Sequence, residues 1–301
     1  MAFFPCLPKP KFKKIRTDLT ARLSDAPYIC NGGSAVTLNG EVHILGGGGV
    51  SSTRRQHYKW DGTKWLPVST LPIDLYYGSA VVYNGKIHIF SVWSHYEWNG
   101  STWTKLGELP YNVTESSAVV YKGDIYLLGG SSSGTTQNFY KWNDYTDTWT
   151  ALRGLAASFR GRMATVFRDS IYVVGYSSQN YWSRWDGSTW TFGNGPTELN
   201  MYNFLDANDG FLIVVDDSMY LYYKDARVRF DGTDWTFLSR RVPHPSSVNT
   251  SWVDTKFHPN KIHNGCVAAD DMGVHIICLQ NSSSEYDATH VLENMNIYIP
   301  A

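Results

Sequence analysis

The sequence is short of charge and of long apolar runs. Charged residues make up 18% of the 301 residues and the net charge is -1, so no global positive field is present to hold a nucleic-acid backbone. No segment has the roughly 20 consecutive apolar residues that a transmembrane helix needs, and no apolar stretch near the N-terminus has the length of a secretion signal. These absences favour a soluble protein with no nucleic-acid partner and no membrane insertion.

Cysteine is also scarce. The four cysteines, Cys6, Cys30, Cys266 and Cys278, have no C-x-x-C spacing. Zinc and redox motifs usually show that spacing, and a disulfide framework needs a denser pattern in a shorter chain. We therefore expect buried or free thiols.

Aromatic residues and glycine are abundant, with 12 Trp, 20 Tyr and 26 Gly, which suits strands and tight turns. A hairpin segment recurs six times. Its clearest copies are residues 34–45, 79–90 and 117–128, in which two apolar, β-branched runs flank an Asn-Gly or Lys-Gly pair. Such a pair is typical of a two-residue hairpin turn. Weaker copies occupy residues 163–174, 204–215 and 266–277.

A second motif follows each hairpin and consists of an aromatic residue, a turn built on Asp or Asn, and a second aromatic residue. It occupies residues 60–65, 98–103, 142–149, 185–190 and 230–235, and weakly 286–291. The first aromatics, at 60, 98, 142, 185, 230 and 286, are 38, 44, 43, 45 and 56 residues apart. Two hairpins per repeat give four strands, as in one blade of a propeller.

The hairpins that end in Leu-Gly-Gly, at 45–47 and 128–130, and the later aromatic pairs resemble the kelch repeat over residues 34–291. The resemblance implies an all-β fold, a six-bladed kelch-type β-propeller over residues 31–301, with residues 1–30 as an N-terminal extended arm or closing segment. Two segments compete to close the ring, 15–27 and 291–300. We favour the C-terminal one as the strand that completes the sixth blade.

One position aligned across the six copies, which we call the column, carries an aromatic or imidazole ring in five of them. It holds His43, His88, Tyr126, Tyr172, Ile213 and His275. Because the column accepts tyrosine and isoleucine, we interpret its histidines as strand residues on a sheet face and not as metal ligands. The Asp and Asn residues of the second motif are interpreted as turn formers. The sequence thus predicts no catalytic residue, no cofactor and no metal.

Enzymes of the kelch family have patterns that do not carry over to this sequence. The radical-copper oxidases need a Tyr and a Cys that crosslink, together with two His ligands, and the cysteines here do not match. The iron-dependent specifier proteins use Glu-x-x-x-Asp-x-x-x-His, of which Asp254 and His258 are present while Thr250 replaces the Glu. Sialidase-type propellers need three arginines that hold a carboxylate, and only Arg160 and Arg162 form a close pair.

The connection 238–264, between the fifth and sixth repeats, is a long insertion that the repeat does not explain, and loops of this length are often functional. Aromatic and arginine residues there, in the arm and in the loops after the inner strands are the expected contacts to a partner or ligand. They are Phe3, Phe4, Trp93, Tyr181, Trp182, Arg240, Arg241, His244, Trp252, Phe257, His258 and His263.

Propellers with Trp-Asp-Gly turns look similar to kelch-like propellers of tailed-phage virion proteins, from the tail, baseplate or capsid. That similarity implies a non-enzymatic structural or recognition role in the virion, with other copies of the chain, other proteins or a host glycan as partners. Without it, a soluble cytoplasmic protein is expected. The alternative is a sugar-active kelch-type enzyme resembling sialic-acid mutarotases or sialidases, which convergent Arg, His and carboxylate groups in the central cavity would favour.

Overall fold

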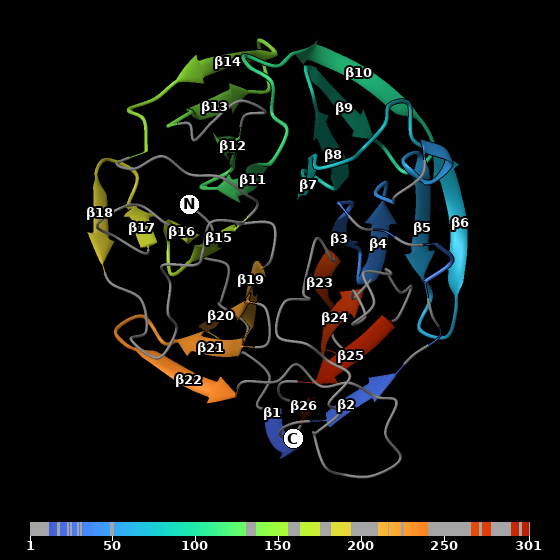
Figure 1. The fold of residues 1–301 in the computed structure, drawn as a ribbon, viewed down its shortest axis with the longest axis vertical. Helices are drawn as coiled ribbons and strands as arrows, with labels where there is room; N and C mark the ends of the chain where they lie inside the picture. Colours follow the sequence, from blue (N-terminus) through green and yellow to red (C-terminus); the bar gives the residue numbers. More distant parts are fainter. Residues whose placement is uncertain are drawn as a thin grey trace, which may run out of the picture.

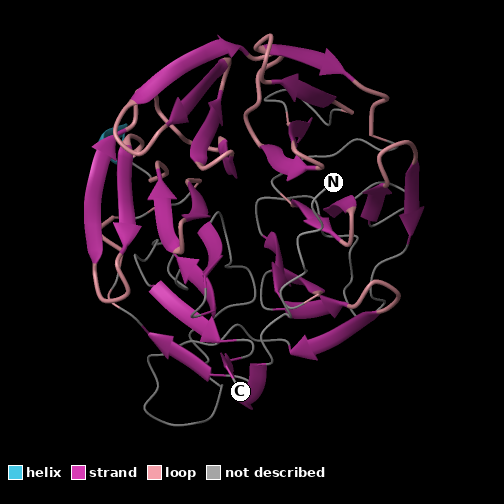
Figure 2. Cartoon of the chain, turned by 180° about the vertical axis from the view of Figure 1, so that it is seen from behind, coloured by secondary structure: helices cyan, strands magenta, loops and turns pink. Residues whose placement is uncertain are grey.

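The computed structural model describes a chain made almost entirely of β-strands. The described residues are 12–16, 19–22, 24, 26–28, 30, 32–48, 51–130, 137–155, 163–174, 182–193, 210–215, 217–223, 226–239, 266–270, 273–277, 290–294 and 297–300. Their only helical segment is the 3-10 turn η1 (Ser51–Thr53), a small mark among the strands of Figure 2. Within the same residues, no helix has the length and apolar character needed to cross a bilayer.

Five blades each contain four strands that follow one another in the chain. Blade one contains β3 (Ser34–Leu38), β4 (Glu41–Leu45), β5 (Gln56–Trp60) and β6 (Trp65–Thr70). Blade two contains β7 (Ser79–Tyr83), β8 (Lys86–Ser91), β9 (Ser94–Trp98) and β10 (Trp103–Glu108). Blade three contains β11 (Ser116–Tyr121), β12 (Asp124–Gly129), β13 (Phe139–Asn143) and β14 (Thr148–Ala151).

The next two blades repeat this order. Blade four contains β15 (Ala164–Phe167), β16 (Ser170–Val174), β17 (Trp182–Trp185) and β18 (Trp190–Gly193). Blade five contains β19 (Gly210–Val215), β20 (Ser218–Tyr223), β21 (Ala226–Phe230) and β22 (Trp235–Ser239). In Figure 1 the first strand of each blade lies near the centre of the ring and the fourth lies on the perimeter.

The two ends of the chain meet in a composite sheet, which we call the closing sheet. It joins β2 (Leu19–Arg22) to β25 (His290–Asn294), β24 (Gly273–Ile277) and β23 (Cys266–Asp270). A separate two-stranded sheet pairs β1 (Phe12–Arg16) with β26 (Ile297–Pro300). In Figure 1 the closing sheet runs from β23 near the centre of the ring down to β2, next to β1 and β26 at the bottom.

The closing sheet corrects the expected fold. The prediction of six blades with an N-terminal extended arm is wrong, because five blades consist of consecutive strands and the remaining four-stranded sheet is a composite of the two chain ends. The strand that completes it is β2, from the segment 15–27 that we had ranked second, and not the C-terminal strand β26. Pairing β2 with β25 covers an edge that would otherwise be exposed.

The predicted hairpins of the first three blades are confirmed. Asn39 and Gly40 both have positive φ, 53° and 79°, which a type I′ turn requires and which Asn-Gly tolerates. The fifth copy is wrong in position. Gly210–Val215 pairs with Ser218–Tyr223, so the hairpin begins where we had expected its second strand. The column residue there is consequently Tyr220, which lies opposite Ile213.

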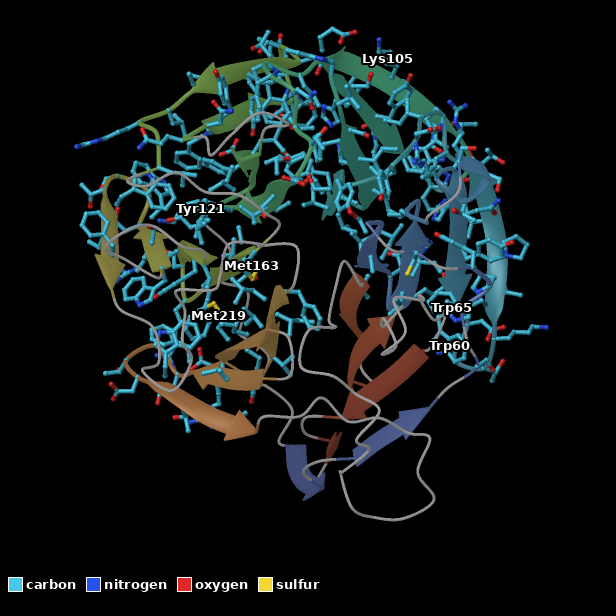
Figure 3. The ribbon with its side chains drawn as sticks, in the orientation of Figure 1. Trp60, Trp65, Lys105, Tyr121, Met163 and Met219 are labelled. Atoms are coloured by element: carbon cyan, nitrogen blue, oxygen red, sulfur yellow. The ribbon has the colours of Figure 1, made fainter. Side chains whose placement is uncertain are left out.

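Neighbouring blades pack face to face through apolar side chains, because successive side chains of a strand point to opposite faces of the sheet. Between blades one and two, buried Leu45 shares a cluster with Ile87 and Ile89. Farther round the ring, Met163 and Met219 belong to one cluster that spans blades three to five, and Figure 3 labels both on the side opposite blade one. The ring is therefore held by repeated interfaces between blades.

Cys30 departs from the expectation of free thiols. It is disulfide-bonded and fully buried in a cluster that also contains Ile44 of blade one and Ala268 of the closing sheet. A disulfide is therefore present where the ring closes. The spacing rules gave no sign of it, because a structural disulfide needs no local sequence motif.

Candidate functional site

One face of the propeller carries the described turns between second and third strands in blades one and two, together with the connections that follow these two blades. We call it the loop face. Backbone hydrogen bonds tie the two kinds of segment together, since Leu75 donates to Arg54 at 2.9 Å and Gly47 donates to Leu75 at 2.6 Å. A Cβ on Gly46 would collide with the Leu75 carbonyl oxygen. The double glycine after β4 thus permits this close approach, which a larger residue would prevent.

The turn between β8 and β9 presents two apolar side chains to solvent. Val92 is 48% exposed and Trp93 is 50% exposed. Val92 has a φ of 54°, an uncommon conformation for a β-branched residue that costs roughly 1–3 kcal/mol. The Val92 carbonyl accepts from Val113 N–H at 2.9 Å, and the Trp93 carbonyl accepts from Leu109 N–H at 3.0 Å. Buried Val113 and Leu109 therefore fix the backbone of an exposed apolar tip.

A cationic and aromatic group lies on the same face. Arg55 Nε donates to Asp74 Oδ1 at 2.7 Å, and the Arg54 guanidinium lies 4.5 Å from the centre of the Tyr76 ring. Ser91 Oγ donates to the Asp74 carbonyl at 2.8 Å, which joins this group to the strand that precedes Val92. We call Arg54, Arg55, Asp74, Tyr76 and Trp93 the loop-face patch.

Two imidazoles form a buried pair in blade one. His43 Nδ1 and His57 Nε2 are 2.9 Å apart, and each side chain is at most 2% exposed. His57 Nδ1 is 2.8 Å from Ser69 Oγ, which also accepts from Trp103 Nε1 at 3.0 Å. Burial is the main cause that lowers the pKa of His43 to about 4 and that of His57 to about 3. We call this pair one.

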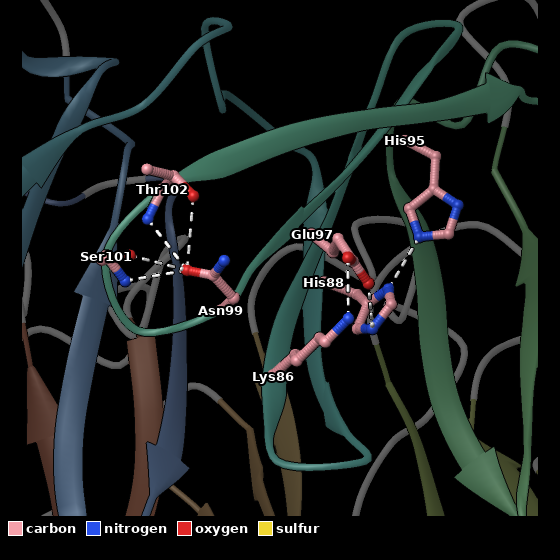
Figure 4. Close-up of polar contacts among 7 residues, drawn as sticks. All are labelled: Lys86, His88, His95, Glu97, Asn99, Ser101 and Thr102. Atoms are coloured by element: carbon pink, nitrogen blue, oxygen red, sulfur yellow. Dashed lines mark hydrogen bonds and ion pairs between the residues drawn. The ribbon is translucent and has the colours of Figure 1, made fainter.

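Blade two repeats the arrangement, as Figure 4 shows. His88 Nδ1 and His95 Nε2 are 2.9 Å apart, and both are buried. His88 Nε2 faces Glu97 Oε2 at 3.9 Å, while Glu97 Oε1 accepts from Lys86 Nζ at 2.8 Å. Burial lowers the pKa of His88 to about 4 and that of His95 to about 2. We call this pair two.

The serine and histidines of pair one have the order of a nucleophile with its base, but their surroundings favour a structural role. A general base needs a pKa near the working pH and access to the substrate. His57 is 1% exposed and its pKa is about 3. Ser69 Oγ is already engaged by His57 and by the Trp103 indole of blade two. The network therefore packs two blades together.

The turns of the second motif act as expected from their sequence. Asp61 Oδ1 accepts from Thr63 N and Lys64 N, each at 2.8 Å. Asn99 Oδ1 accepts from Ser101 N and Thr102 N, each at 3.0 Å. These residues are turn formers, as predicted. In the described part of the chain, no three His, Cys, Asp or Glu side chains are placed to hold a metal.

Two of the predicted contact residues are described. Trp93 belongs to the loop-face patch. Trp182 packs within the blades, with ring centres 5.9 Å from Tyr172 and 6.1 Å from Phe230. The others lie outside the described residues: Phe3, Phe4, Tyr181, Arg240, Arg241, His244, Trp252, Phe257, His258 and His263.

Sequence reasoning missed most of the patch. Arg54 and Arg55 lie in a loop that had been considered, but Asp74 and Tyr76 lie in the connection to the next blade. Only the return of the fourth strand to the loop face brings these segments together. An Arg-Arg pair between two hairpin strands was the available signal, and by itself it indicates only an exposed turn.

Comparisons with known proteins support the fold. Residues 107–252 match the family model described as the DUF6242 β-propeller domain. The solved structure of YjhT is similar with a TM-score of 0.68 and 12% identity, over 92% of this chain and 99% of that one. A comparison with curated proteins finds no match. The chain is thus a β-propeller, and neither similarity relates it to a phage protein.

Proposed function

We propose that this chain is a recognition propeller that binds a partner protein through the loop-face patch. The observation that carries the proposal is the Val92–Trp93 tip, at which two apolar side chains stay exposed while the Val92 backbone is fixed in an uncommon conformation. Strained backbone persists where the surrounding structure over-determines it, often at sites of function. A preformed aromatic anchor lowers the entropy that binding would otherwise cost.

The composition of the patch supports a protein partner. Trp, Tyr and Arg are the residue types most enriched where protein interfaces gain their affinity, and Trp93, Tyr76 and Arg54 supply one of each. Asp74 already pairs with Arg55, so the charges of the patch are partly balanced. Such a surface suits a neutral or mildly acidic partner.

The kelch resemblance, an assembly role and a virion location remain parts of this proposal. The connection 238–264 is proposed as a further contact in an assembly, whereas β1 and β2 of the segment 1–30 pair with strands of the same chain. The Cys30 disulfide favours an oxidising location, such as a virion or cell surface, because thiols stay reduced in most cytosols. Sugar-active catalysis is the alternative.

A comparison of two exposed aromatic residues tests the proposal. Trp93→Ser removes the anchor from the loop face, whereas Tyr145→Ser changes a side chain that is 95% exposed in the turn between β13 and β14, at the opposite ends of the strands. Each protein is immobilised and exposed to extract of the source cells, and the dissociation constant is measured for the purified partner. We expect binding to weaken at least about tenfold for Trp93→Ser and to stay unchanged for Tyr145→Ser.

Equal binding by wild-type protein and Trp93→Ser would contradict the proposal. The same proteins are applied to a glycan array and assayed for mutarotation of sialic acid. Capture of a glycan that depends on Trp93 would replace the protein partner by a sugar. Catalysed mutarotation by the wild-type protein would favour the enzyme alternative.

A further inference from the structure

The two imidazole pairs bridge strands within one blade and face the aromatic residues of the next. The ring of Trp98, from blade two, lies 5.0 Å from His57 of pair one. The ring of Trp142, from blade three, lies 4.9 Å from His95 of pair two. Both pairs are thus part of interfaces between blades, where little water is available to solvate an added charge.

The hydrogen bonds of pair two depend on its protonation state. The Glu97 carboxylate, 3.9 Å from His88 Nε2, favours the neutral form in which His88 carries its hydrogen on Nε2, so that His95 Nε2–H donates to His88 Nδ1. His95 Nδ1 then carries only a lone pair. It is buried and has no hydrogen-bond partner in the described part of the chain. The neutral pair therefore leaves one acceptor unsatisfied.

A proton can enter this pair by two routes, and both have the same result. It binds His95 Nδ1 directly, or it binds His88, whose Nδ1–H then donates to His95 Nε2 and forces the remaining hydrogen of His95 onto Nδ1. Either way, as long as the bond between the rings persists, His95 Nδ1 becomes an N–H donor without an acceptor. A buried, unsatisfied donor beside a new charge is costly.

Pair one differs at this position. His57 Nδ1 is 2.8 Å from Ser69 Oγ, and a hydroxyl oxygen has two lone pairs, so it accepts from both His57 and Trp103. A protonated pair one therefore keeps its hydrogen bonds. The matching position of blade two, next to Glu108 on β10, is Gly107, which has no side chain to offer.

The charged groups around each pair compensate only in part. Glu41 raises the pKa of His43 and Lys59 lowers it. Lys59 Nζ also donates to Glu41 at 2.9 Å. In the same way, Glu97 raises the pKa of His88 and Lys86 lowers it.

Two carboxylates of blade three reach the interface with blade two, and both have other partners. Asp144 accepts from Tyr83 Oη at 2.9 Å. Asp147 accepts from Trp142 Nε1 at 3.0 Å. Neither of them accepts a hydrogen bond from His95 Nδ1.

We propose that the two imidazole pairs form an acid-sensitive latch that holds blades one, two and three together near neutral pH and loosens them on mild acidification, with pair two as the weaker member. Trp93 lies two residues before His95 in the chain, so loosening of pair two alters the loop-face patch. The latch itself does not depend on the proposed function.

The direction of the pH effect follows from the two states of the chain. In the unfolded chain each histidine protonates near its ordinary pKa of 6.5, whereas burial holds the folded pKa values at about 2 to 4. Stability is therefore complete above pH 6.5 and falls as the pH drops toward 4. Each histidine changes the unfolding equilibrium about tenfold per pH unit in this range. Asp61 and Asp231, whose pKa values are lowered in the folded chain, change the stability only as the pH falls below their ordinary pKa of 3.8.

The test replaces the pairs by residues that the same protein uses at the same place. His88→Tyr with His95→Phe copies blade three, in which Tyr126 and Phe139 occupy these positions. Urea unfolding is measured at pH 7.5 and 5.0. We expect the unfolding equilibrium of the wild-type protein to shift by about a thousandfold more between these pH values than that of the double variant, or about thirtyfold for each histidine.

A second measurement needs no variant. Hydrogen exchange of the wild-type protein, corrected for the intrinsic pH dependence, is followed at pH 7.5 and 5.0. We expect protection of β8 and β9 to fall more than that of β12 and β13. Equal pH dependence of the double variant and the wild-type protein, or equal loss of protection in blades two and three, would overturn the latch. Both outcomes are independent of partner binding.

Discussion

Blades two and three pack against their neighbours in the same way with different side chains. In blade two the second and third strands supply His88 and His95, which lie against Trp142. In blade three the same positions hold Tyr126 and Phe139, and the Phe139 ring lies 5.4 Å from Trp185 of blade four. The interface thus needs two rings at these positions but does not need imidazoles.

The difference separates what the fold requires from what the pairs add. Tyr126 and Phe139 stack with ring centres 5.6 Å apart and an interplanar angle of 24°, and neither titrates between pH 4 and 7. His95 instead has an unpaired buried nitrogen. Blade two therefore carries a polar defect that blade three shows to be dispensable for packing, which is why we infer a role for it.

The largest effect is expected when the imidazole pair of blade two is copied into blade three. Tyr126→His with Phe139→His moves an imidazole pair into blade three, where Phe139 is 1% exposed. The smaller rings leave unfilled volume and bring buried polar nitrogens, so we expect a loss of about 2–5 kcal/mol in the free energy of unfolding at pH 7.5. Urea unfolding should show a further loss at pH 5.0. A variant as stable as the wild-type protein would show that the two interfaces are not equivalent.

A smaller effect should distinguish the two pairs. His57→Phe removes one partner from His43 and one from Ser69, whereas His95→Phe breaks one hydrogen bond and removes an unsatisfied nitrogen. We expect His57→Phe to be the more destabilising by about 1 kcal/mol at pH 7.5. The two substitutions are matched in shape change, so their difference in urea midpoint reports the hydrogen bonds. The reverse order would contradict the assignment of His95 Nδ1 as unpaired.

The sequence predicted much of the repeat but little of the site. Paired motifs such as Asn39-Gly40 and Trp60 with Trp65 are local, and local turn chemistry determined the hairpins correctly. The closing strand β2 was ranked second because strand pairing between the chain ends has no local signal. The same reason explains the imidazole pairs. His88 was seen only as a column residue, and its partner His95 lies on another strand, at a position set by sheet register.

The smallest effect concerns the turns between third and fourth strands, where blade one has Asp61 and blade two has Asn99. Asp61 Oδ1 accepts its backbone hydrogen bonds at 2.8 Å and Asn99 Oδ1 at 3.0 Å, as expected when the acceptor is charged. Asn99→Asp should therefore raise the urea midpoint slightly, while Asn99→Ala should lower it. The turn hydrogen bonds lower the pKa of Asp61, so the gain from Asp at position 99 should be present above pH 3.8 and should disappear as the pH falls below it. A gain that persists in acid would show that the carboxylate charge is not its cause.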